Sequence, residues 1–111
     1  MIHPVNILPR AQKDVFDCYD WIAQFSAAAA DRWYQAFLVA VEQVSHGPSS
    51  YPLVPEASRL AAPIRVFVFQ DNPRRRYHGL FLVTDGEVQV LRVRGPGQGP
   101  LTEDELGIEI Q

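Results

Sequence analysis

Apolar residues follow three patterns along this chain of 111 residues. In residues 3–8 they alternate with other positions and stop at Pro9, which predicts a short strand at or near a sheet edge. In residues 10–46 they recur every three or four positions, which predicts helices. Further on, three runs rich in Val, Phe, Leu and Tyr predict strands at residues 64–69, 77–83 and 88–94.

The helical region divides into two helices. The first covers residues 10–25, with Asp14, Asp17 and Asp20 on its polar side. Ser26 is suited to cap the second helix, which ends near His46, before Gly47-Pro48. The two apolar stripes are Ala11, Val15, Cys18, Tyr19, Ile22 and Phe25, and then Trp33, Phe37, Ala40, Val41 and Val44. Such a hairpin needs a sheet to cover, and we expect Trp21, Trp33 and Phe37 in the shared core.

The resulting order is one strand, two helices and three strands. Asp85-Gly86 favours a tight hairpin between the last two strands, so these three strands form an antiparallel meander. Residues 49–63 make a long connection, which we expect to be packed by Tyr51, Leu53, Val54 and Leu60 or to serve a function. The predicted fold class is α+β, with the helices on one face of a mainly antiparallel sheet. Residues 1–111 form a single domain, in which 95–111 are an acidic, flexible tail.

Composition is that of an ordinary globular protein, with 47% apolar and 21% charged residues. The chain has no signal-peptide pattern and no apolar run long enough to span a membrane, so we expect a cytoplasmic protein. Its single cysteine, Cys18, excludes an internal disulfide. We interpret Cys18 as a buried helix residue, because no histidine is obviously placed to activate its thiol.

Charge is unevenly distributed, although the net charge is only −3. Residues 1–57 carry three bases and six acids, residues 58–94 seven bases and three acids, and residues 95–111 four acids and no base. The middle segment therefore predicts a sheet with a basic strip. Such a strip is either a solvated face or a surface for an acidic partner or a nucleic-acid backbone.

Small matches spread over nearly all of residues 5–94 resemble the RelE/ParE toxins of bacterial type II toxin–antitoxin systems, which include plasmid stabilisation proteins. The matching residues are Leu8-Pro9-Arg10-Ala11 with Asp14, Trp21-Ile22, Trp33 and Phe37, Pro48 through Pro55-Glu56, Ile64-Arg65, Tyr77 with Phe81, and residues 88–94. The resemblance implies the same βααβββ fold and a growth-inhibiting toxin whose partner is a cognate antitoxin. It implies no cofactor and no metal.

Members of this family act in two ways. ParE-like members bind DNA gyrase and poison it without catalysis of their own, whereas RelE-like members are ribonucleases that cleave mRNA on the ribosome. Cleavage needs a base, cations to stabilise the phosphate and an acid for the leaving oxygen. The catalytic candidates here are His78 and Arg65. In the resemblance, His78 stands where many members have an arginine. The candidates for binding RNA, another target or the antitoxin are Arg65, Arg74, Arg75, Arg76, Arg92 and Arg94.

Plainer interpretations accompany these candidates. We favour His78 as a partly buried strand residue over a catalytic one, and Arg74–Arg76 as a solvated loop after Pro73 over a phosphate contact. The other arginines are alternatively explained as partners of Glu56 or Asp71. The RelE-like pattern implies lysines and arginines on the sheet and a Tyr or His near the C-terminus. Here no Tyr, His or Lys follows Arg94, and Lys13 is the only lysine, so the C-terminal acid of that pattern is absent. We therefore place the gyrase poison first, a ribosome-dependent mRNA endoribonuclease second and a non-toxic interaction module third. The oligomeric state of the free protein stays open.

Overall fold

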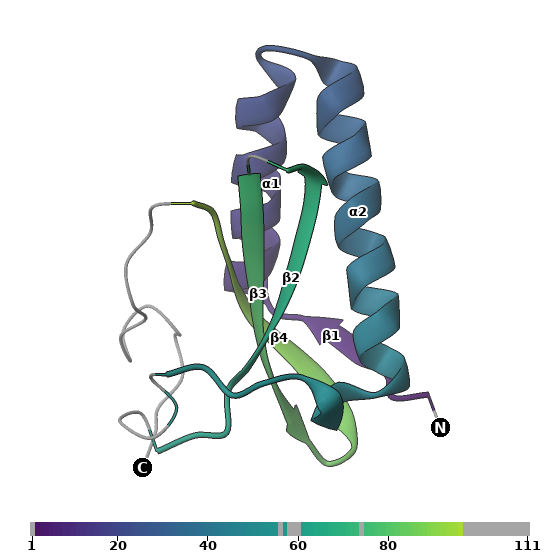
Figure 1. The fold of residues 1–111 in the computed structure, drawn as a ribbon, viewed down its shortest axis with the longest axis vertical. Helices are drawn as coiled ribbons and strands as arrows, with labels where there is room; N and C mark the ends of the chain where they lie inside the picture. Colours follow the sequence, from purple (N-terminus) through teal and green to yellow (C-terminus); the bar gives the residue numbers. More distant parts are fainter. Residues whose placement is uncertain (1, 56, 58–60, 74, 97–111) are drawn as a thin grey trace.

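The structure is a computed structural model that describes residues 2–55, 57, 61–73 and 75–96. Strand β1 (Val5–Ile7) leads into the helices α1 (Pro9–Ala23) and α2 (Ala27–His46). A short 3-10 helix, η1 (Pro48–Ser50), follows, and then come the strands β2 (Arg65–Asn72), β3 (Arg75–Thr84) and β4 (Glu87–Arg94). The two helices stand side by side, and the turn between them projects beyond the ends of β2 and β3 (Figure 1). This order confirms the α+β prediction.

The four strands form one mixed sheet in the order β1-β4-β3-β2. β1 pairs in parallel with β4, and Val5 lies opposite Val88. The β2–β3 and β3–β4 pairs are antiparallel, as the meander predicted. The turn at Asp85 and Gly86 has positive φ at both residues (54° and 77°), which explains the Asp-Gly pair at this position. The N-terminal strand thus joins the meander at one edge of its sheet.

Both helices begin where the sequence indicates. Pro9 occupies the first turn of α1, where its missing N–H costs no hydrogen bond. The Ser26 side chain accepts a hydrogen bond from the Ala29 N–H at 3.1 Å and so caps α2. The first helix ends at Ala23, two residues before the predicted end, and Phe25 lies in the turn that follows.

Buried side chains form two clusters, one for each face of the sheet. The larger cluster joins both helices to the sheet, with Trp33 and Phe37 among its largest members, and includes Phe67, Phe81 and Val93. The smaller cluster is Val54, Ala57, Ile64, Leu80 and Leu91. Buried helix residues belong to the larger cluster alone, which is compatible with helices on one face. We call the face with Phe67, Phe81 and Val93 the helix-side face, and the face with Leu80 and Leu91 the outer face.

The connection before β2 packs on the sheet as predicted, with one exception. The Tyr51 ring meets Phe81 edge-on, with the ring centroids 5.8 Å apart. Val54 is buried and donates its N–H to the Ile64 carbonyl at 2.8 Å. Leu53 is 52% exposed, so its predicted burial was wrong, and Leu60 lies outside the described residues.

Two aromatic residues predicted on the buried side of the first helix are exposed. Trp21 is 52% exposed and Phe25 is 75% exposed, whereas their neighbour Ile22 is buried. They lie near the turn between the helices, which projects past the strands and so finds no sheet to cover it (Figure 1). The predicted loop between β2 and β3 is also corrected, because Arg75 and Arg76 belong to β3 and not to a loop. Arg74 and residues 97–111 of the predicted acidic tail lie outside the described part of the chain.

Candidate functional site

The strand register brings four of the predicted residues together on the outer face. His78 lies opposite Arg94 on β4 and opposite Val68 on β2, and Leu80 lies opposite Arg92. Residues two apart on a strand share a face, so Arg76 and His78 point the same way as Leu80. The outer face therefore carries Arg76, His78, Arg92 and Arg94. The His78 side chain is exposed, so the interpretation of His78 as partly buried was wrong.

Arg65 points to the other face. Its partner across the sheet is Phe81, a helix-side residue, and β3 separates β2 from β4. The strand alternation that places Arg65 beside Phe81 puts His78 on the opposite side of the sheet. The structure therefore does not bring the two predicted catalytic residues, Arg65 and His78, to one site.

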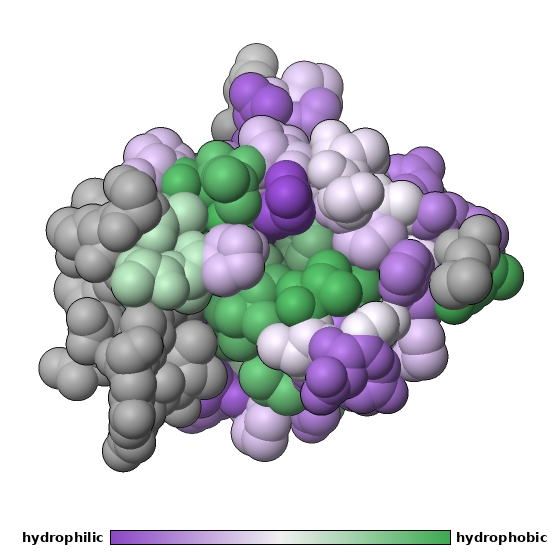
Figure 2. Space-filling model, turned by 90° about the horizontal axis from the view of Figure 1, so that it is seen from below, coloured by the Kyte–Doolittle hydropathy of each residue, from purple (hydrophilic) through white to green (hydrophobic). Residues whose placement is uncertain are grey.

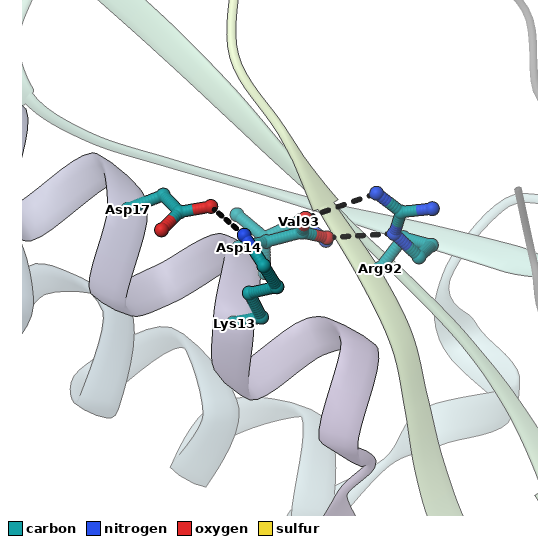
Figure 3. A network of polar contacts seen from close by, with 5 residues as sticks. All are labelled: Lys13, Asp14, Asp17, Arg92 and Val93. Atoms are coloured by element: carbon teal, nitrogen blue, oxygen red, sulfur yellow. Dashed lines mark hydrogen bonds and ion pairs between the residues drawn. The ribbon is translucent and has the colours of Figure 1, made fainter.

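Arg92 is engaged with a residue of α1. Its Nε donates to Asp14 Oδ2 at 2.8 Å and its Nη2 to Oδ1 at 3.0 Å, a bidentate pair whose side chains are 17% and 16% exposed (Figure 3). Asp14 Oδ2 also accepts the backbone N–H of Val93 at 2.9 Å. Charge-assisted bidentate contacts are among the stronger polar contacts in proteins. The positive charge of Arg92 is therefore matched inside the protein.

Asp14 replaces a strand partner that β4 lacks at this point. β1 follows β4 only as far as Val90, whose carbonyl accepts the Leu8 N–H at 3.0 Å. Beyond it the Val93 N–H meets the Asp14 carboxylate (Figure 3). The sequence interpretation placed Asp14 on the polar side and considered Glu56 or Asp71 as partners of the arginines. The missed signal was spacing, because position 14 is three after Ala11 and four before Cys18, on the apolar stripe.

Arg75 lies on the helix-side face and contacts the exposed indole of α1. Its guanidinium carbon is 5.4 Å from the centre of the Trp21 ring, a cation–π distance. Together they border a hollow of about 450 Å³ that is also lined by Asp17, Cys18, Tyr77, Gly95 and Pro96. Burial raises the pKa of the Cys18 thiol to about 11, with smaller contributions from Asp14 and Asp17. The thiol is therefore protonated at neutral pH and is a poor nucleophile.

A longer groove runs between α2 and β2. It has a volume of about 670 Å³ and is lined by Gln35, Ala36, Val39, Ala40 and Gln43 of α2, by Val68, Phe69 and Gln70 of β2, and by Pro73 and Arg76. β2 is the last strand of the sheet, and at its start the Val66 N–H bonds the Pro52 carbonyl outside the sheet. By alternation, the backbone N–H and C=O of Val68 also point away from β3, at the edge of the sheet, where the described residues provide no neighbouring strand. The groove therefore lies beside an open strand edge.

Neither a metal site nor a membrane span is found in the described residues. No group of three or more His, Cys, Asp or Glu side chains within them is arranged to hold a metal ion. Among the described helices, none combines the length and the apolar character needed to cross a bilayer.

Comparison with known proteins identifies a family that matches this chain. Residues 5–98 match the family model of the ParE toxin of the type II toxin–antitoxin system parDE. The match covers β1 to β4 and both helices. A search of curated proteins found no match.

Proposed function

The chain belongs to the ParE toxin family of type II toxin–antitoxin systems, and we propose that it acts as a DNA gyrase poison that a cognate antitoxin neutralises. One observation carries the choice against RNA cleavage by the predicted pair: Arg65 and His78 point to opposite faces of the sheet, although Arg76 and Arg94 share the face of His78. A base and a phosphate-stabilising cation must reach the same bond, so this pair is unsuited to cleave RNA. The match of Arg92 to Asp14 removes a further cation from such a site.

The target is tested by inducing the protein in a bacterial host while DNA damage response and mRNA integrity are followed together. We expect induction of the damage response and intact mRNA. His78→Ala serves as the discriminating variant, because its exposed side chain can be removed without loss of buried contacts. Loss of mRNA that His78→Ala prevents would instead establish the ribonuclease. Normal growth with neither response would support the non-toxic interaction module.

We place the antitoxin in the groove between α2 and β2. An extended peptide segment there gains two kinds of contact, backbone hydrogen bonds to the open edge at Val68 and apolar contacts to Val39 and Ala40. Segments that add a strand to a sheet edge obtain affinity from the backbone and specificity from side-chain pockets. Arg76 at the rim of the groove favours an acidic residue in the segment.

A matched pair of variants tests this placement. Val39 and Leu38 are neighbouring apolar residues on α2, both exposed, but only Val39 lines the groove. Val39→Glu should weaken the binding of a cognate antitoxin about tenfold or more, because it puts an unpaired charge into a desolvated contact. Leu38→Glu should leave the dissociation constant nearly unchanged. Equal effects of the two substitutions, measured by calorimetry on folded variants, would place the antitoxin elsewhere.

Charge reversal at Arg94 tests the outer face separately from the groove. Arg76 is left intact because it lines the groove, and Arg92 because of its contact with α1. If acidic antitoxin residues meet the outer face, Arg94→Glu should slow binding and weaken its dependence on salt. An unchanged association rate and salt dependence would show that the antitoxin does not meet Arg94.

A further inference from the structure

A small recess lies near the β3–β4 turn and the N-terminus. It has a volume of about 250 Å³ and is lined by His3, Pro48, Ser49, Pro63, Arg65 and Val83. Figure 2 shows this end of the molecule from below, with apolar residues gathered in a central hollow and polar residues around them. The recess belongs neither to the groove beside α2 nor to the outer face.

Arg65 is the fixed charge of the recess. Its side chain is half-buried, and Nη1 donates to the Tyr51 carbonyl at 2.5 Å. Tyr51 in turn packs against Phe81, the residue opposite Arg65, so the accepting carbonyl is itself held in place. No carboxylate of the described residues forms an ion pair with Arg65, in contrast to Arg92 with Asp14. A guanidinium has five N–H donors, so Arg65 can donate to a ligand as well as to the Tyr51 carbonyl.

The other walls suit a small anion. Ser49 contributes a hydroxyl group, and Pro48, Pro63 and Val83 are apolar. The Nδ1 atom of His3 lies 2.9 Å from the Gly86 carbonyl oxygen, which only accepts, so Nδ1 donates there and the ring is oriented. The recess thus combines one half-buried cation with further polar groups at the protein surface.

We propose that this recess is a carboxylate-binding site, and that its ligand is an acidic side chain of a protein partner. One guanidinium matches a singly charged carboxylate in charge and in its planar, two-point geometry. A phosphate carries more charge than Arg65 alone neutralises. The volume is below the range of about 300–1,000 Å³ that is usual for small-molecule sites and suits one side-chain group.

The test uses the full chain labelled with nitrogen-15. The side-chain Nε–H of Arg65 and the amides of Ser49 and Val83 are followed by NMR while sodium acetate replaces sodium chloride at constant ionic strength. We expect saturable shifts at these three positions. A capped Ala-Glu-Ala peptide should give the same shifts, and capped Ala-Gln-Ala should give none. Arg76→Gln, which removes a surface arginine outside the recess, should bind acetate as the wild type does.

Three variants make the result decisive. Arg65→Gln should abolish the saturable shifts of Ser49 and Val83, and Arg65→Lys, which keeps the charge but loses the planar fork, should weaken binding several-fold. Ser49→Ala changes an exposed residue and should weaken binding without altering the fold, even if an Arg65 variant does not fold.

Three outcomes overturn the proposal: no saturation beyond that of chloride, tighter binding of inorganic phosphate than of acetate, or acetate binding without peptide binding. The first excludes an anion site, the second indicates a phosphate ligand, and the third indicates a free small carboxylate. None of them touches the gyrase proposal, which rests on other residues.

Discussion

The two edges of the sheet differ in how their backbone groups are satisfied. At the β4 side, β1 pairs with Val88–Val90 and the Asp14 carboxylate then takes over at Val93. At the β2 side, the described residues cover the start of the strand, through Pro52 and Leu53, and beyond it they leave a groove. Open edges invite pairing with another chain, and proteins usually block them. The β4 edge is thus closed by contacts within the chain, and the β2 edge is the one at which we propose that the antitoxin binds.

The largest expected effect concerns the aromatic core that holds α2 against β2. Trp33 is fully buried and contacts Phe69 and Tyr77, with ring centroids 5.6 and 5.3 Å away. Trp33→Ala should lower the free energy of unfolding by about 3–5 kcal/mol, because it leaves a large cavity. Denaturant titration measures this loss. A loss below about 1 kcal/mol would contradict the assignment of Trp33 to the core.

A smaller effect is expected at the closed edge. Asp14→Ala removes the carboxylate that bonds the half-buried Arg92 guanidinium and the Val93 N–H, and should cost about 2–3 kcal/mol. Asp17→Ala is the control, because its ion pair with Lys13 is exposed, and it should hardly move the melting temperature. The double variant Asp14→Ala with Arg92→Met should recover part of the loss. If Asp14→Ala and Asp17→Ala behave alike, Asp14 does not secure this edge.

The next prediction concerns Gly79 of the central strand. A Cβ atom at this position would lie 2.0 Å from Cζ of Phe67, whose ring covers the glycine in the buried cluster. Gly79→Ala should therefore destabilise the protein by about 1–3 kcal/mol through overpacking. Combining it with Phe67→Leu should cost less than the sum of the two single changes. Additive losses in denaturant titrations would show that the two residues do not compete for this space.

The smallest effect is chemical. Because burial raises the pKa of Cys18 to about 11, its alkylation by iodoacetamide at pH 8 should be much slower than that of an exposed thiol. The rate should rise as the pH approaches 11. The unfolded thiol loses its proton first, so the stability contributed by this group falls as pH rises between its ordinary pKa of 9.0 and about 11. Rapid alkylation of the folded protein at pH 8 would contradict this raised pKa.

The sequence was sufficient for the elements and the family, because periodicity, Pro9, Ser26 and Asp85-Gly86 are local features. It failed where the answer depended on which part of a helix the sheet reaches. Trp21 has a spacing suited to the core, yet the hairpin end projects past the strands. Strand alternation predicts that the Arg65 and Ile64 side chains point to opposite faces of the sheet. The position of β3 between β2 and β4, however, follows only from the three-dimensional order of the strands. The contact between Asp14 and Arg92 was missed because the two residues lie 78 positions apart in the sequence.

The parallel pairing of β1 with β4 also has a consequence for synthesis. Val5 meets Val88, so the first strand stays without its partner until almost the whole described chain has been made. Contacts between distant positions slow folding, since a long loop must close before they form. A nascent chain that carries β1 and both helices but lacks β4 cannot close the β1 edge. We therefore expect β1 to join the sheet late in folding, after β4 has been made.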